Sequence, residues 1–131
     1  MKKDIQIPEV SGVEVAVVFE YNDMYKSDDW NVYIINKKEL PLEMVVIVSK
    51  GYDEKDQTSV MRKKIDSLPA NSFAKVELIQ PELFKLNNTF QVSFFEGNQL
   101  KDKTFTFPKN SIKEGNLRMI GSLNKRGILA R

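Results

Sequence analysis

The chain has 131 residues, of which 41% are hydrophobic and 29% are charged, and its formal net charge is +2. This balance is typical of a globular protein and argues against wholesale disorder. The sequence contains no His and no Cys, which excludes disulfides, zinc sites built from those ligands, thiol nucleophiles and a Ser-His-Asp triad. Only carboxylate pairs, Lys, Tyr or an oxygen-bound cation remain for catalysis, so we expect a protein that is not an enzyme and that holds no cofactor or metal.

The N-terminal segment MKKDIQIPEV is not the pattern of a secretory signal, because Asp4, Gln6 and Pro8 interrupt its apolar residues. No apolar run approaches the ~20 residues that a membrane-spanning helix needs. We therefore expect a cytoplasmic protein without membrane contact, organised as one domain over residues 1–131. Its charge is uneven: residues 1–66 hold 10 Lys and Arg against 13 Asp and Glu, whereas residues 67–131 hold 10 against 5.

A period of two dominates the first half of the chain and predicts strands. VEVAVVFEY and WNVYIIN each place apolar side chains at alternate positions. LEMVVIVSK is apolar on both faces, which predicts a central strand covered on both sides. TSVMRKKID is polar and predicts an edge strand. The residues expected to face inward in the first two strands are Val13, Val15, Val17, Phe19, Tyr21, Trp30, Val32 and Ile34.

The same alternation continues in FAKVELIQ, TFQVSFFEG and KDKTFTFP. Gly97 and Asn98 tolerate the backbone of a tight turn and predict a hairpin between the last two strands. PELFKLNN predicts a helical turn, and Ser111 with Glu114 has the spacing of a helix capping box. The residues expected to face inward here are Ala74, Val76, Leu78, Phe90, Val92, Phe94, Phe105 and Phe107.

Seven short strands at a spacing of roughly 8–15 residues, without a long amphipathic helix, predict an all-β fold, namely an antiparallel β-sandwich with short helical turns. A barrel is the alternative. The core is expected over about residues 13–107. The C-terminal segment 108–131 is expected to be irregular, because Gly121 and Gly127 disfavour a free helix, and to pack on its own domain or on a partner.

The runs VYIINKKELPLEMVVIVSKG, SVMRKKIDSLPANSFAKVELI and NTFQVSFFEGNQLKDKTFTF together resemble an immunoglobulin- or fibronectin-III-like domain. The shared features are an Asn-containing loop after one strand, the turn LPANS before another, and paired hairpins. The chain is also similar to small uncharacterised bacterial proteins of this length with such a sandwich. It lacks the Cys pair of antibody domains, so it resembles a cysteine-free member. The resemblance implies a fold and no activity, because this fold hosts many functions.

Two acidic loops are candidate cation or ligand sites. Asp53, Glu54 and Asp56 lack the alternating ligand spacing of a calcium loop, and the twelfth position from Asp53 is Lys64 rather than Glu, so we favour a solvated loop. Residues 22–30, NDMYKSDDW, combine oxygen ligands with aromatic side chains. This loop is a candidate for carbohydrate or cation binding, although a polar connection capped by core aromatics has the same composition.

The basic residues are the nucleic-acid candidates. Arg62 and Lys64 share one face of the predicted edge strand, and Lys125, Arg126 and Arg131 follow in the C-terminal segment. No aromatic side chains for base stacking lie within the edge strand. Lysine-rich edges block strand-to-strand aggregation, and we favour this structural role for Arg62 and Lys64.

Phe95 lies on the face opposite Phe94, and with Tyr33 it is a candidate exposed aromatic patch for a partner, unless the C-terminal segment covers it. We therefore expect a non-catalytic protein-interaction module that binds an unidentified protein, or a second copy of itself, through an edge or this patch. The alternatives are a nucleic-acid-associated protein that uses the basic residues and a carbohydrate- or cation-dependent binder that uses residues 22–30.

Overall fold

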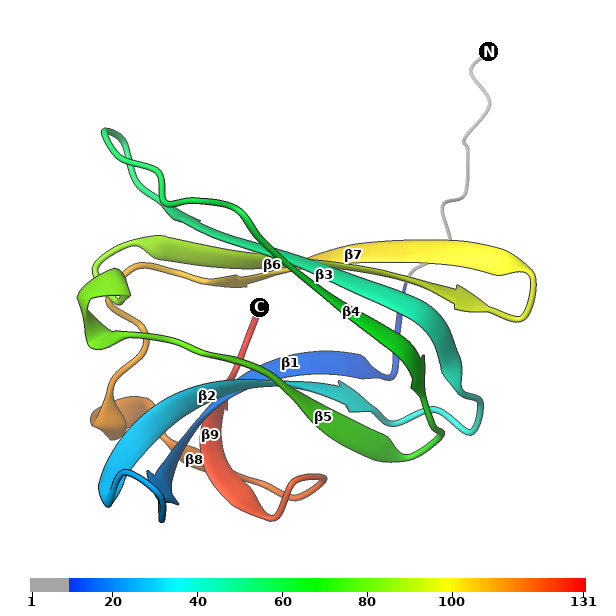
Figure 1. Ribbon diagram of the computed structural model, residues 1–131, viewed down its shortest axis with the longest axis horizontal. Coiled ribbons are helices and arrows are strands. Elements are labelled where there is room, and N and C mark those ends of the chain that lie inside the picture. The colour runs from blue at the N-terminus through cyan, green and yellow to red at the C-terminus, as the bar shows by residue number, and fades with distance from the viewer. Residues whose placement is uncertain (1–9) are drawn as a thin grey trace.

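The computed structural model describes residues 10–131 as two antiparallel sheets that face each other (Figure 1). One sheet has the strand order β5-β2-β1-β9-β8 and the other has the order β4-β3-β6-β7. The predicted all-β sandwich is therefore confirmed. The strands are β1 (Val13–Asn22), β2 (Ser27–Asn36), β3 (Leu42–Tyr52), β4 (Met61–Leu68), β5 (Ser72–Leu78), β6 (Asn87–Glu96), β7 (Gln99–Phe107), β8 (Arg118–Ile120) and β9 (Lys125–Leu129).

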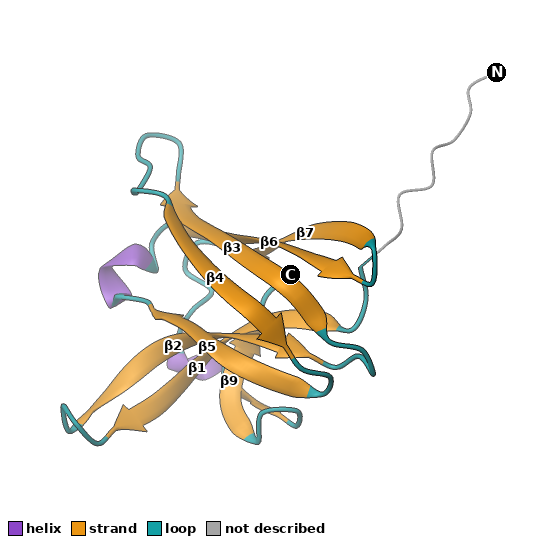
Figure 2. Ribbon diagram, turned by 45° about the vertical axis from the view of Figure 1, so that its right-hand side comes forward, coloured by secondary structure: helices purple, strands orange, loops and turns teal. Residues whose placement is uncertain are grey.

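The core lies between the two sheets, where their inner faces meet (Figure 2). Val15 pairs with Ile34 across β1 and β2, and the inward side chains of β6 and β7 close the other side. The rings of Phe90 and Phe107 pack edge to face with centroids 5.9 Å apart, a favoured aromatic geometry. The predicted alternation holds for Trp30, Val32 and Ile34 and for the Phe and Val positions of β6 and β7 that are expected to face inward, all of which are buried.

Three expectations about the strands are wrong, each for a local reason. β3 is central, but no layer formed by residues 10–131 covers its outer face, and Met44 at an irregularity of the strand is 66% exposed. Tyr21 is 59% exposed because the β1–β2 hairpin extends beyond the sandwich. Leu78 is exposed because β5 carries a β-bulge opposite Val32 and Tyr33, which reverses the alternation after Val76.

The turns follow the predicted positions with one exception. β6 and β7 form the expected hairpin, with Gly97 at a φ of 62°, and the helical turn η1 (Pro81–Leu83) lies in PELFKLNN. A second turn, η2 (Glu114–Asn116), has no side-chain cap. The predicted capping box is wrong because the Ser111 hydroxyl donates to the carbonyl of Pro108 instead.

The C-terminal segment completes the five-stranded sheet. β9 pairs with β1, with Val17 opposite Ile128, and β8 pairs with β9. The turn between them places Ile120 and Leu123 on the outer face of the sheet, over a second buried cluster that includes Ala16, Val18, Tyr33 and Ile35. Beyond β9, Arg131 exchanges two backbone hydrogen bonds of 2.9 Å with Thr106 of β7, so the chain end joins both sheets.

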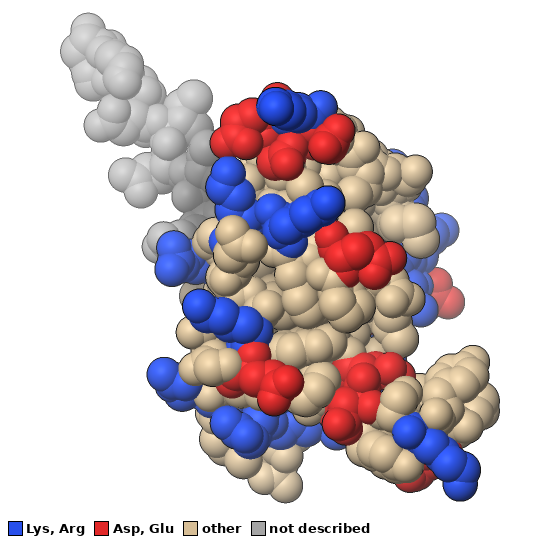
Figure 3. All heavy atoms as spheres, turned by 90° about the vertical axis from the view of Figure 1, so that its left-hand side faces the viewer, with Lys and Arg blue, Asp and Glu red and all other residues tan. Residues whose placement is uncertain are grey.

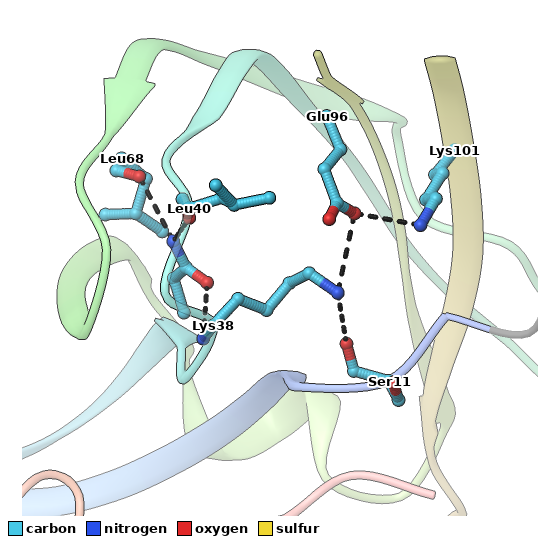
Figure 4. A network of polar contacts seen from close by, with 7 residues as sticks. Ser11, Lys38, Leu40, Leu68, Glu96 and Lys101 are labelled. Carbon is cyan, nitrogen blue, oxygen red and sulfur yellow. Dashed lines mark hydrogen bonds and ion pairs between the residues drawn. The ribbon is translucent and has the colours of Figure 1, made fainter.

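One end of the sandwich is fastened by a polar cluster around Asn36 and Lys38 (Figure 4). The buried Asn36 amide nitrogen lies 2.9 Å from the carbonyl oxygen of Leu40, 3.3 Å from that of Leu68 and 3.0 Å from that of Pro69. The Lys38 Nζ reaches the Ser11 carbonyl at 3.2 Å and Glu96 Oε1 at 3.4 Å, and Lys101 donates to the same oxygen at 2.8 Å. The cluster joins β2, β4, β6 and β7.

Gly127 provides a test of the C-terminal packing. A Cβ atom at this position would lie 2.6 Å from the Val17 carbonyl oxygen and 2.9 Å from the Ile120 side chain. We expect Gly127→Ala to lower the free energy of unfolding by about 1–3 kcal/mol, as overpacking does. Urea denaturation is the measurement. Gly121→Ala in the same hairpin meets no atom within 4 Å and should have little effect; equal effects of the two substitutions would contradict the close packing.

Candidate functional site

Tyr33 and Phe95 do not form a shared patch. Tyr33 lies on the outer face of the five-stranded sheet and is 6% exposed, because Ile120 and Leu123 cover it. Phe95 lies on β6 of the other sheet and is half-buried. The expected aromatic surface is therefore wrong, and the C-terminal segment occupies the place that a partner was expected to take.

The Tyr33 hydroxyl belongs to a polar cluster centred on Glu20. It donates to Glu20 Oε2 at 2.6 Å, Asn31 Nδ2 donates to the same oxygen at 2.8 Å, and Lys125 Nζ lies 3.0 Å from Oε1. Burial raises the pKa of Glu20, but the hydrogen bonds and Lys125 outweigh burial and hold this pKa below its usual value. Burial and Glu20 together raise the pKa of Tyr33. Lys125 is thus engaged within the protein.

The basic candidates do not form one surface. Arg62 and Lys64 lie on β4, at the edge of the four-stranded sheet, whereas Arg126 is exposed on β9 of the other sheet. The predicted edge position of this strand is confirmed, since β3 is the one strand among the described residues with which β4 pairs. Lys63 pairs with the buried Ile47 and so points toward the inner side. Inward-pointing charges also discourage pairing at an open edge.

Hydrogen bonds from the loops' own side chains shape both acidic loops. Asp53 Oδ1 accepts the backbone N–H groups of Lys55 and Asp56, at 2.8 and 2.7 Å, and so shapes the β3–β4 loop. Glu54 pairs with Lys109 at 3.1 Å. Figure 3 shows the acidic side chains gathered at the tip of this loop, at the top of the view. Within residues 10–131 no group of three or more acidic side chains is arranged to hold a metal ion.

Residues 22–30 form a tight hairpin turn followed by the start of β2. Asn22 Oδ1 accepts the N–H groups of Met24 and Tyr25, and Asn22 Nδ2 donates to Asp29 at 2.9 Å. Trp30 is buried against Phe19 and Phe84, so its ring cannot stack on a ligand. The tip nevertheless exposes large side chains, since Met24 is 80% and Tyr25 71% exposed. It projects from the body at the lower right of Figure 3.

The outer face of the four-stranded sheet carries no covering layer within the described residues. The register places the half-buried Val46 beside Ser93 and Val48 beside Gln91. The β3–β4 loop borders this face and forms with it a groove of about 680 Å³. Lys50 on β3 lines the groove, and Arg62 and Lys64 lie on the neighbouring strand β4. None of these three cations has an acidic partner within 4.0 Å among residues 10–131.

A smaller pocket of about 300 Å³ lies between the sheets near Ser49, toward the end of β3, whereas Asn36 contacts Leu40 just before β3 begins, so the pocket lies at the opposite end of the sandwich. The β5 bulge pairs Glu77 with the buried Val32 and so turns the carboxylate inward. Its Oε1 accepts the hydroxyl of Ser49 from the other sheet at 3.1 Å. Ile79, Leu83 and Phe90 supply apolar walls. Burial raises the pKa of Glu77, and the Ser49 hydrogen bond only partly opposes this.

Glu77 is not among the residues predicted for a site, because simple alternation in FAKVELIQ places it on the solvent face of the strand. A signal was present, since Leu78 and Ile79 are both apolar and leave two possible phases for the end of the strand. Of these two residues only Ile79 is buried, so the end of the strand follows the phase in which Ile79 and Glu77 face inward. The bulge in β5 thus turns the Glu77 side chain toward the interior of the sandwich.

No protein-family model, curated protein or solved structure matches this chain. In the part of the chain that the structure describes, no helix combines the length and apolar character needed to cross a membrane. The structural features that bear on function are the hairpin tip, the outer groove and the Glu77 pocket.

The raised pKa of Glu77 predicts a pH-dependent cost to stability. A carboxyl group whose folded-state pKa exceeds its unfolded-state pKa destabilises the fold as the pH rises through that interval. Glu77→Gln should therefore raise the melting temperature by a few degrees at pH 7 and leave it unchanged near pH 3. Glu82→Gln, on the exposed turn η1, is the matched control. A lower melting temperature for Glu77→Gln at pH 7 would count against this account.

The Glu20 cluster has the opposite dependence. Its lowered pKa means that its contribution is present above the unfolded-state pKa and is lost as the pH falls through the folded-state pKa. Glu20→Ala leaves the buried Tyr33 hydroxyl and Asn31 amide without their acceptor, which should cost about 1–3 kcal/mol at pH 7. Urea denaturation at pH 7 and pH 3 measures both effects. Glu14→Ala, which breaks a 3.7 Å pair with Lys37, should cost less than about 1 kcal/mol.

Proposed function

We propose that this protein is a non-catalytic β-sandwich module that associates head to tail with further copies of itself. In each contact the β1–β2 hairpin tip of one copy occupies the groove on the outer face of the four-stranded sheet of the next. The observation that carries the proposal is the exposure of three large side chains, Tyr21, Met24 and Tyr25, on one projecting hairpin. Large exposed apolar groups gathered in one place mark interaction sites.

Both surfaces carry charges of both signs: the tip holds Lys26 between Asp23 and Asp28, and the outer face holds Lys50, Arg62 and Lys64 beside the acids of the β3–β4 loop. Asp23 and Asp28 flank the exposed side chains of the tip. Val48 and Lys50 line the groove, and the half-buried Val46 continues the same outer face beside it, with Lys64 and Arg62 opposite Val46 and Val48 on β4. Apolar contact at the centre with opposite charges at the rim is the usual anatomy of a protein interface. The contact is small, so we expect weak association.

A nucleic-acid partner fits this groove less well. Asp53, Glu54 and Asp56 border the same groove as the cations and would repel a phosphate backbone. Among the residues that the structure describes, Tyr52 is the only aromatic one that lines the groove, whereas sequence-neutral binding of single strands uses several stacking platforms. Lys125 and Arg126, in the other sheet, cannot extend the groove.

We also propose that the sandwich is of the immunoglobulin-like type. In support, β1, β2 and β5 follow the order of strands A, B and E of that fold, and β3, β6 and β7 follow the order of C, F and G. β4 departs from the constant-domain pattern, because it pairs with β3 rather than with β5. The β8–β9 hairpin is an addition to the seven strands.

Sedimentation velocity on the full chain tests the association. The average sedimentation coefficient should rise with protein concentration at about 50 mM salt and fall at about 500 mM, where charges are screened. Met24→Ser/Tyr25→Ser removes the large exposed side chains of the tip, and Arg62→Glu/Lys64→Glu reverses the charge beside the groove. Each of these variants alone should stay monomeric. Mixed together, they should form dimers and nothing larger, because only one intact tip and one intact groove remain.

Lys113→Glu/Arg126→Glu changes the net charge as much as the groove variant but lies outside both surfaces, and it should associate like the native chain. A native chain that remains monomeric at all concentrations would contradict the proposal. Binding of a single-stranded DNA oligonucleotide that depends on Arg62 and Lys64 would favour the nucleic-acid alternative instead.

A further inference from the structure

Glu77 differs from the other two glutamates held in side-chain networks. Glu20 has Lys125 at 3.0 Å, and Glu96 has Lys101 at 2.8 Å and Lys38 at 3.4 Å. Glu77 has a single neutral partner, the Ser49 hydroxyl, and no cation within 4.0 Å among residues 10–131. A half-buried carboxylate is normally stabilised by a cation or by several hydrogen bonds.

Three other polar side chains of the pocket already have partners, and Lys50, which also lines the pocket, follows the buried Ser49 on β3 and so projects from the opposite face of the sheet. The Asn88 amide nitrogen donates to the carbonyls of Leu83 and Leu86. The Thr58 hydroxyl accepts the N–H of Gly51 and donates to the Ser59 carbonyl. Ser49 donates to Glu77 Oε1. Glu77 Oε2 makes no hydrogen bond within the described residues, so it is the acceptor that the pocket offers to a ligand.

We propose that this pocket binds a primary alkylammonium ion, either the head of a lysine side chain or a free aliphatic amine. The ammonium group would donate to Glu77 Oε2, and its alkyl stem would lie along Ile79, Leu83 and Phe90, as lysine stems do on apolar surface. A volume of about 300 Å³ is at the lower limit for ligand pockets and suits a short chain. The exposed Met61 stands at the rim.

The geometry favours an ammonium over a guanidinium group. A guanidinium binds a carboxylate best through two parallel hydrogen bonds, one to each oxygen. Ser49 already occupies Oε1, which leaves one oxygen for a compact, single-point donor. This inference is independent of the head-to-tail association, because the pocket lies between the sheets and the groove lies outside them.

The test is an NMR titration of the full chain with n-butylammonium chloride, followed through backbone amide shifts. We expect saturable shifts at Ser49, Glu77, Ile79 and Phe90. n-Pentanol, which has similar length without charge, should bind at least about tenfold more weakly, as the loss of a charge-assisted hydrogen bond implies. n-Butylguanidinium should also bind more weakly. Acetyl-lysine-amide, with its ε-amine free, separates a lysine side chain from free amines as the source.

Glu77→Gln keeps an acceptor for Ser49 and should reduce butylammonium affinity at least about tenfold, whereas Glu82→Gln should leave it unchanged. Ser49→Ala frees Oε1 and should improve guanidinium binding relative to ammonium binding. Equal binding of pentanol and butylammonium by the native chain would overturn the proposal, and so would native affinity in Glu77→Gln. The first of these comparisons needs no variant and stands even where a substitution impairs folding.

Discussion

The side chain of Asn36 contacts two of the four connections through which the described chain passes from one sheet to the other, β2–β3 and β4–β5. Its amide nitrogen faces the carbonyls of Leu40, after β2, and of Leu68 and Pro69, between β4 and β5, while its Oδ1 accepts the N–H of Lys38. A buried amide in a low-dielectric site is costly to leave unpaired, so these contacts fix both crossings at once. The register of the inner strands depends on where those crossings lie.

Because this end is fixed, the opposite end can carry features that cost stability. At the Asn36 end, Lys38 and Lys101 both contact Glu96 Oε1, so this carboxylate has two cationic partners. At the other end, the bulge in β5 turns Glu77 inward with only a serine to receive it. Partly satisfied acids and projecting hairpins are tolerated where the surrounding frame is determined elsewhere. The candidate sites lie at that end and on the outer face for this reason.

The sequence predicts the parts of the fold that follow from period-two burial, such as β1, β2, β6 and the turn at Gly97. It does not predict whether a face is covered, because Ala16 and Val18 on β1 and Val46 and Val48 on β3 have similar patterns. Residues more than a hundred positions away decide this for β1, through Ile120 and Leu123. Glu77 and the pairing of Lys125 with Glu20 likewise depend on a bulge and on a distant strand rather than on local pattern.

Only one of the two sheets has its outer face covered by described residues, and this determines which surfaces the proposed self-association can use. The C-terminal hairpin occupies the outer face of the five-stranded sheet, and Gly127 lets it approach the β1 backbone closely. The open groove therefore belongs to one sheet, and the exposed tip, as part of β1 and β2, belongs to the other. In the proposed contact one tip meets one groove, so every pair of molecules still has one free tip and one free groove. Growth of the proposed assembly is therefore limited by geometry and protein concentration rather than by closed symmetry.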